Sequence, residues 1–299
     1  GEYRLDGTIG FDTNSLSLPD WDLQLEQIDG KLAFTLDGLA ADDIQARALG
    51  QAVTIDVATQ DGGTTRVTAA ANLPVAAIQG QLPALPLGFA EGRSDFEIRV
   101  DIPSRGASAT TPARLGIDSS LTGVTIDLPA PMGKTSQTRR PLELQIPLGR
   151  NGAAGMLRYD DLIAARFSAD GRRIGIGLNE GLPELPGEAG VIVGGQIPLL
   201  DIAAWQATLQ SLGRGDDRSL PPLTIDVGID RLLTPAMDLD AASVRATHRD
   251  AAWDVEMDAV QLAGSARVPA TLPAEPLIVA LERLELELPL SESSEATPI

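Results

Sequence analysis

The stretch Phe96–Ile102, FEIRVDI, decides the fold class because apolar and charged side chains alternate along it one by one. A period of two puts every apolar side chain on the same face of a β-strand. The pattern recurs along the chain and predicts about 17 strands. The other clear sets have apolar positions at Trp21, Leu23, Leu25; Leu32, Phe34, Leu36; Val53, Ile55, Val57; Val124, Ile126, Leu128; Leu142, Leu144, Ile146, Leu148; Leu223, Ile225, Val227, Ile229; Trp253, Val255, Met257; and Leu284, Leu286, Leu288.

Glycine turns separate these sets at short intervals. Asp29-Gly30, Asp37-Gly38, Asp61-Gly62-Gly63 and Asp170-Gly171 can adopt positive φ and join neighbouring antiparallel strands. Long helical crossovers are missing from the pattern, which disfavours a parallel α/β sheet. The sequence therefore predicts an all-β chain in which successive strands pair antiparallel.

One segment, Asp201–Leu212, changes to helical spacing through Ile202, Trp205 and Leu209. Asp201 fits the N-cap of this helix and Gly213 fits the residue after its end. A weaker helical turn is expected over Pro74–Gln79. Since a helix cannot continue a strand ladder, both are expected at an edge or mouth of the sheet, where the first could pack on the core or act as a lid.

The composition narrows the class of protein. Apolar residues make up 43% of the chain but aromatic residues only 3%, so the apolar face is aliphatic. The net charge of −19 opposes binding to nucleic acid or to anionic membrane surfaces. There are no cysteines, and no apolar run approaches the roughly 20 residues of a spanning helix. Without an initiator Met or a signal peptide, we expect a segment of a longer protein, so any membrane anchor would lie outside it.

Such a sheet must cover a long apolar face. Alternation alone favours two sheets packed on each other, a sandwich or solenoid with a scaffold or adhesion role. The alternative is an open trough covered by a ligand, and an aliphatic trough without polar groups suits acyl chains. Both interpretations stay open on the alternation alone.

The sequence offers little support for a catalytic or metal-binding site. His248 is the only histidine and is expected in an exposed loop. The acid pairs Asp42-Asp43, Asp160-Asp161 and Asp216-Asp217 are expected in solvated turns, without the spacing of a calcium loop. The basic cluster Lys134, Arg139 and Arg140 is interpreted first as a solvated loop and second as a contact for lipid headgroups. We expect no enzymatic activity, no metal and no cofactor.

Five blocks, in order, resemble the AsmA-like family of Gram-negative envelope proteins, in particular its YhdP branch. They are TGVTIDLPAPMGK (122–134), RRPLELQIPLG (139–149), GGQIPLLDIAAW (194–205), WDVEMDAVQLAGSARVPA (253–270) and PLIVALERLEL (276–286). Residues 90–288 carry the stronger match, and residues 1–90 match in style, as in LEQIDGKLAFTLDGLAADDIQARALG (25–50). The resemblance implies one continuous repetitive β-groove over residues 1–290. Residues 291–299 are polar and are expected to form a flexible tail.

The resemblance also implies a function. A long curved antiparallel sheet of the bridge-like lipid-transfer type would carry phospholipids in its groove across the periplasm, from an inner-membrane anchor toward the outer membrane and envelope partner proteins. Ile202, Trp205 and Leu209 would then form a lid helix. The residues expected to line the groove are Trp21, Leu23, Leu25, Leu32, Phe34, Val53, Ile55, Phe96, Ile98, Val100, Val124, Ile126, Leu128, Leu142, Leu144, Ile146, Leu223, Ile225, Val227, Val255 and Met257.

Overall fold

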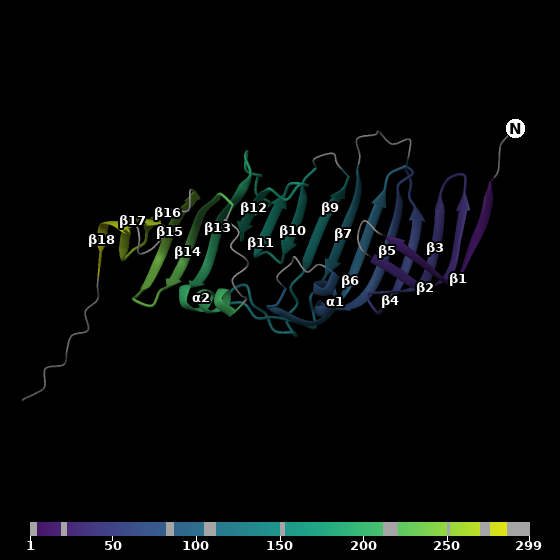
Figure 1. The fold of residues 1–299 in the computed structure, drawn as a ribbon, viewed down its shortest axis with the longest axis horizontal. Helices are drawn as coiled ribbons and strands as arrows, with labels where there is room; N and C mark the ends of the chain where they lie inside the picture. The colour runs from purple at the N-terminus through teal and green to yellow at the C-terminus, as the bar shows by residue number, and fades with distance from the viewer. Residues whose placement is uncertain are drawn as a thin grey trace, which may run out of the picture.

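The computed structural model describes residues 5–18, 23–81, 87–104, 112–149, 153–211, 221–249, 252–269 and 276–285. Over these ranges the chain forms one long, open, curved sheet of 18 strands with two short helices (Figure 1). The strands are β1 (Asp6–Leu18), β2 (Leu23–Thr35), β3 (Leu39–Ala48), β4 (Gln51–Thr59), β5 (Thr65–Pro74), β6 (Ala90–Ile102), β7 (Ala113–Ser119), β8 (Val124–Ile126), β9 (Leu142–Leu148), β10 (Gly155–Tyr159), β11 (Ile163–Phe167), β12 (Arg173–Leu178), β13 (Gly190–Asp201), β14 (Leu223–Leu233), β15 (Asp238–Arg249), β16 (Ala252–Asp258), β17 (Leu262–Pro269) and β18 (Ile278–Leu284). The helices are α1 (Val75–Gln81) and α2 (Ile202–Ser211).

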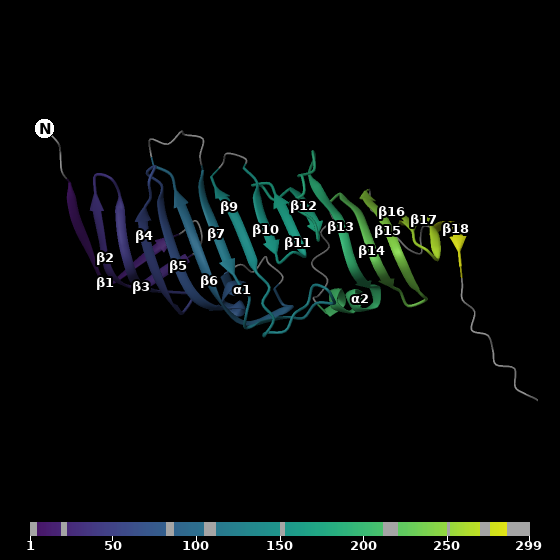
Figure 2. The same cartoon turned by 180° about the vertical axis from the view of Figure 1, so that it is seen from behind.

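The strands follow one another across the sheet in chain order, from β1 at one end to β18 at the other (Figures 1 and 2). The exception is β8, a strand of three residues that pairs with the start of β6 while β7 pairs directly with β9. The predicted all-β class and the expected long curved sheet are therefore confirmed.

Two neighbouring pairs differ from the antiparallel prediction, because β12, β13 and β14 run parallel to one another. Each parallel pair needs a connection that returns the chain to the same end of the sheet. The connection between β12 and β13 is residues 179–189, and the one after β13 begins with α2. Residues 179–189 contain no helix, and α2 has only ten residues, so neither connection was recognised from the sequence as the crossover of a parallel pair.

Three of the four predicted glycine turns are confirmed. Asp37-Gly38 joins β2 to β3, Asp61-Gly62-Gly63 joins β4 to β5, and Asp170-Gly171 joins β11 to β12. The prediction at Asp29-Gly30 was wrong, because these residues lie inside β2. Here the register with the neighbouring strands shifts and Gly30 has a φ of 152°. Glycine thus supplies an irregularity within a strand rather than a turn.

Both predicted helices are present. In α2 the carboxylate of Asp201 accepts a hydrogen bond of 2.9 Å from the backbone N–H of Ala204, which confirms the N-cap. The expected end residue, Gly213, lies outside the described residues, as do the predicted tail 291–299 and the acid pair Asp216-Asp217. No helix in the described ranges is both long and apolar enough to cross a membrane.

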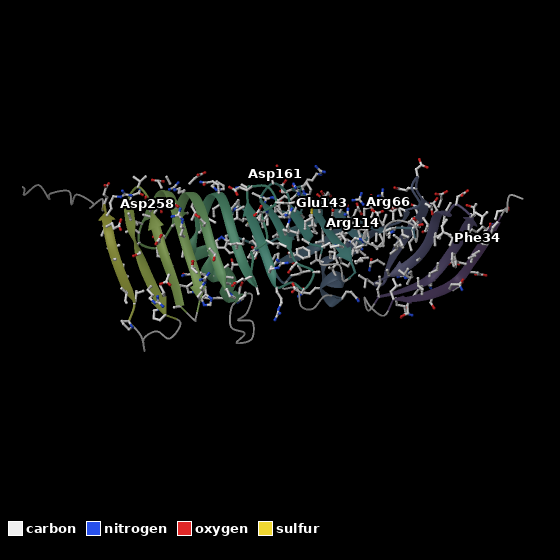
Figure 3. All side chains as sticks on the ribbon, turned by 90° about the horizontal axis from the view of Figure 1, so that it is seen from above. Phe34, Arg66, Arg114, Glu143, Asp161 and Asp258 are labelled. Carbon is white, nitrogen blue, oxygen red and sulfur yellow. The ribbon has the colours of Figure 1, made fainter. Side chains whose placement is uncertain are left out.

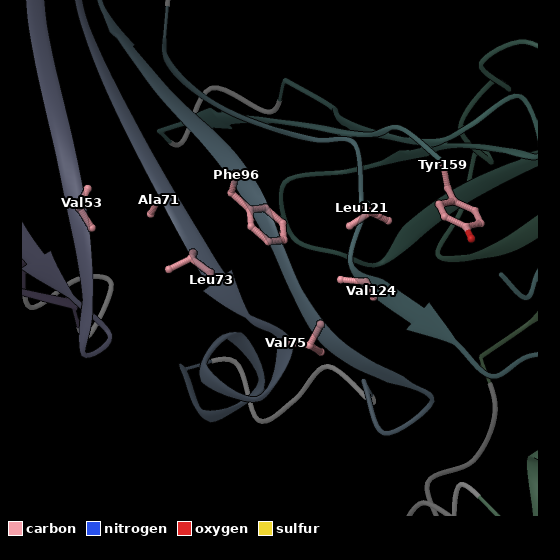
Figure 4. Close-up of a cluster of buried hydrophobic side chains, with 8 residues drawn as sticks. All are labelled: Val53, Ala71, Leu73, Val75, Phe96, Leu121, Val124 and Tyr159. Carbon is pink, nitrogen blue, oxygen red and sulfur yellow. The ribbon is translucent and has the colours of Figure 1, made fainter. Parts of the chain in front are cut away.

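Buried side chains gather in three clusters on one face of the sheet rather than between two sheets. The cluster drawn in Figure 4 joins Val53, Ala71 and Phe96 of β4–β6 to Leu121 and Val124, which follow β7. A second cluster lies under β13–β15 around Ile229, and a third lies at β2–β4 around Ile44. Within the described ranges all strands belong to one continuous sheet or to the short β8 pairing. The self-packed sandwich favoured by alternation alone is therefore wrong.

Candidate functional site

The strand register aligns apolar side chains into an unbroken row across the sheet. Residues directly opposite each other in paired strands share a face, so the pairing can be followed from strand to strand. One such row, here called the central row, takes one residue from every strand from β3 to β18 except β8. Its members are Ile44, Ile55, Ala69, Ile98, Ile117, Leu144, Leu157, Ala165, Ile176, Val193, Ile225, Ala246, Val255, Ala266 and Val279. Every one is aliphatic, and none has a hydrogen-bonding side chain.

A second row on the same face runs parallel to the central row, here called the rim row. Its only polar side chains are Ser119 and Tyr159. Its members are Ala46, Val53, Ala71, Phe96, Ser119, Leu142, Tyr159, Ile163, Leu178, Gly195, Val227, Val244, Met257, Gly264 and Leu281. Ser119 donates to the backbone carbonyl of Asp95 and Tyr159 to that of Met132, so both hydroxyls are satisfied by protein.

The far row, on the other side of the central row, contains the one histidine. Its described members are Ala41, Val57, Val67, Val100, Leu115 and Ile146, then Phe167, Ile174, Val191, Leu223, His248, Trp253 and Val268. The prediction that His248 lies in an exposed loop was wrong. It is half-buried in β15, its ring centroid lies 5.0 Å from that of Trp253, and its Nδ1 is buried without a hydrogen-bond partner among the described residues.

One long edge of this apolar face has a raised rim made of α1, residues 120–141 and α2 (Figure 1). Residues 120–141, here called the rim lobe, leave the sheet after β7 and rejoin it at β9. Leu121 and Val124 pack on the cluster of β4–β6, and Met132 packs on the cluster around Ile229. The rim row is thus partly covered, while most side chains of the central row are half-buried; Ile44 and Ala246 are buried and Val279 is exposed.

Two cations hold the rim lobe together. The ammonium of Lys134 donates to the backbone carbonyls of Leu121, at 2.8 Å, and of Val124. Burial, followed by the nearby charge of Arg140, lowers the pKa of Lys134. Arg140 donates to the carbonyl of Pro131 at 2.7 Å. Two members of the predicted basic cluster are therefore structural, because a Lys134 side chain that is buried cannot lie in a solvated loop or meet a headgroup. Only Arg139 is exposed.

The opposite face of the sheet, here called the outer face, is polar. Oppositely charged residues stand directly across from each other in neighbouring strands, as in Arg66–Asp101 at 2.7 Å and Arg245–Asp226 at 3.2 Å. The hydrogen bond from Arg66 lowers the pKa of Asp101. One face thus carries charged side chains exposed to solvent and the other is mostly hydrocarbon, as the alternation predicts.

Most of the residues predicted to line a groove lie on the apolar face. The central row holds Ile55, Ile98, Leu144, Ile225 and Val255; the far row Val100, Ile146 and Leu223; the rim row Val53, Phe96, Leu142, Val227 and Met257. Leu23, Leu25, Leu32 and Phe34 occupy the same side of β2, and Trp21 lies outside the described residues. That this face binds lipid stays a prediction.

Three of the predicted lining residues belong to the rim lobe instead. The alternation through Val124, Ile126 and Leu128 forms a strand only as far as Ile126. Val124 is 2% exposed and packs under the lobe, so it does not contribute to an open surface. The lobe is recognisable only from its long-range contacts, because its alternation resembles that of the strands on either side.

Sequence reasoning missed the middle of the face, where Leu157, Ala165, Ile176 and Val193 come from β10–β13. Their strands are short, and glycines on the outer face, as in RIGIGL (173–178), weaken the contrast between apolar and polar positions. A count of apolar positions every second residue, regardless of what lies between them, would have found Ile174, Ile176 and Leu178.

The predicted lid helix α2 is packed rather than free at two positions. Ile202 and Trp205 pack against the cluster around Ile229, whereas Leu209 is 62% exposed. The indole Nε1 of Trp205 is buried without a hydrogen-bond partner among the described residues. The helix therefore forms part of the rim in this structure, and a lid role stays a prediction.

The chain was compared with known families, curated proteins and solved structures. The family model described as YhdP protein matches residues 1–298. The chain belongs to the YhdP family. No curated protein and no solved structure matches it. Membership of the YhdP family supports a role related to lipid transfer.

Proposed function

We propose that the apolar face shields the acyl chains of phospholipids while they move through the periplasm between the inner and outer membranes. The observation that carries this proposal is the central row, which is aliphatic from β3 to β18 without a break. Water meets this hydrocarbon surface wherever protein does not cover it, and burying apolar surface contributes about 25 cal/mol for each Å². An acyl chain supplies that burial without needing a hydrogen bond.

The length of the central row favours a lipid track, which is a surface along which lipids can move, over a pocket that holds one lipid. Fourteen steps between strands at about 4.8 Å span roughly 67 Å. One leaflet of a bilayer accommodates an acyl chain in about half of its 30 Å hydrocarbon core. The row is therefore more than four acyl lengths long, as expected for a surface along which lipids travel.

The chemistry of the face supports binding by hydrocarbon rather than by headgroup. The central row has no polar side chain, and the hydroxyls of Ser119 and Tyr159 in the rim row already donate to protein carbonyls. Selection among headgroups needs polar groups placed to recognise them. We therefore propose that the protein acts without enzymatic chemistry and accepts phospholipids of different headgroup, in a parent protein anchored to the inner membrane.

Lipid extraction tests this function. The purified chain should carry phospholipids of mixed headgroup, identified by mass spectrometry after extraction into organic solvent. Absence of bound lipid from the folded protein would overturn the proposal. A single lipid class at fixed stoichiometry would contradict binding through the acyl chains alone.

A further inference from the structure

A pocket of about 290 Å³ opens on the outer face, away from the proposed lipid track. Its charged side chains are Arg114 of β7 and Arg166 of β11, and between them lie Gln145 and Met156. These residues alternate with Leu115, Ala165 and Leu157 of the apolar face, so their side chains leave the sheet on the opposite side. Arg114 is seen in the middle of the sheet in Figure 3.

The connection between β12 and β13 builds one wall of this pocket. It crosses the outer face so closely that a Cβ on Gly175 would lie 2.5 Å from the backbone oxygen of Glu184. A Cβ on Gly177 would likewise lie 2.8 Å from the oxygen of Gly181. Only glycine permits this approach, which brings Leu182 of the connection to the pocket.

No ion pair joins Arg114 or Arg166 to any described residue, whereas Arg66 and Arg245 of the same face each pair with an aspartate. Directly across from Arg114 is Asp101, but the guanidinium of Arg66 already holds both carboxylate oxygens of Asp101, at 2.7 and 3.1 Å. Arg166 stands between Met156 and Gly175, neither of which carries a charge.

An acid beside the pocket is also engaged. Glu143 precedes the pocket residue Gln145 on the same face of β9, and its carboxylate accepts a hydrogen bond of 2.8 Å from the Gln145 amide. The residues that line the pocket include these two arginines and no acid, although the whole chain has 23 basic and 42 acidic residues. The lining of the pocket is thus positive within an acidic protein.

We propose that this pocket binds an acidic segment of a partner polypeptide, with one carboxylate between Arg114 and Arg166 and a neighbouring apolar side chain against Leu182 and Met156. Guanidinium groups recognise carboxylates through paired, charge-assisted hydrogen bonds. The apolar part of the wall favours a peptide over a free phosphate, which would leave that part uncovered. The surrounding negative charge opposes extended polyanions such as nucleic acid.

Fluorescence anisotropy on the 299-residue chain tests the inference. The probe is a labelled pentapeptide of alternating leucine and glutamate. The control peptide is the same sequence with glutamine in place of glutamate. The glutamate peptide should bind, and the double variant Arg114→Gln/Arg166→Gln should weaken its binding by about tenfold or more. The matched control Arg245→Gln removes one charge from the same face outside the pocket and should change the affinity by less than about twofold.

Other outcomes would overturn the inference. They are equal binding of the glutamine peptide, an equal loss in Arg245→Gln, or displacement of the peptide by equimolar inorganic phosphate. Absence of binding would overturn it too. If the double variant melts early, Leu182→Asp supplies a second test, because a carboxylate on the pocket wall should repel the glutamate peptide without removing an arginine. The bound lipid content should stay unchanged in every variant, which separates this site from the proposed lipid track.

Discussion

Replacing Leu144 by aspartate places a carboxylate in the middle of the central row. Leu144 is half-buried, with Ile117 and Leu157 across from it in the neighbouring strands. If the face is open until lipid covers it, water can reach the new carboxylate in the empty protein. The same change at Ile229 puts a charge into a closed cluster, because Ile229 is 1% exposed.

The two sites should therefore differ strongly in stability. Leu144→Asp loses part of the burial of one leucine, about 1–2 kcal/mol, and the carboxylate stays hydrated. Ile229→Asp loses a buried side chain and buries an unpaired charge, which costs about 4 kcal/mol or more. At about 2–4 °C for each kcal/mol, the melting temperature should fall by a few degrees in the first variant and by about 8 °C or more in the second.

Leu144→Asp should weaken lipid binding strongly near position 144, although it lowers stability only slightly. An acyl chain that covers Asp at position 144 must strip water from the carboxylate, which costs about 3 kcal/mol or more and weakens local binding by more than about 100-fold. A benzophenone amino acid at position 157 reports lipid beside the change, and one at position 225 reports lipid farther along the row. Crosslinking to lipid should fall at the first position and persist at the second.

Leu144→Asn is the control, because it matches the size of aspartate without its charge and should keep most of the crosslinking at position 157. A collapse of the melting temperature in Leu144→Asp, comparable to that of Ile229→Asp, would show that the central row is a closed core. Undiminished crosslinking at position 157 would show that acyl chains do not pass over Leu144. Either result would refute the reasoning.

Three further predictions concern the parts of the fold around the apolar face. Gly175→Ala should destabilise the protein by about 1–3 kcal/mol, because its Cβ collides with the crossing connection, whereas Gly116→Ala should be tolerated; denaturant titration compares the two. Lys134→Met should leave two carbonyls of the rim lobe unpaired, at a cost of about 1–3 kcal/mol, and amide exchange should accelerate in that lobe. Arg66→Gln should lower stability near neutral pH by less than about 1 kcal/mol, since the pair with Asp101 is partly exposed. Because the folded pKa of Asp101 is lowered, this difference should vanish in melts as the pH falls below 3.8, where Asp101 becomes protonated.

The sequence determined which side of each strand faces hydrocarbon, because alternation is a local property of the pleated backbone. FEIRVDI, LELQIPL and LTIDVGI each put their apolar residues on the face where the structure places them. The capped helix after Asp201 and the Asp-Gly turns followed from equally local chemistry. The family and the long curved sheet came from resemblance rather than from alternation.

Only the tertiary structure decided which strands are neighbours and what lies over them. The alternation at 124–128 resembles a groove strand, but long-range contacts fold it into the rim lobe, with Lys134 buried beneath it. His248 lies on the apolar face because β15 extends through it, although its local sequence resembles a turn. The parallel pairs and the outer pocket depend on Gly175 and on how closely another segment approaches it. Such proximity is a relation between distant residues, so no local periodicity encodes it.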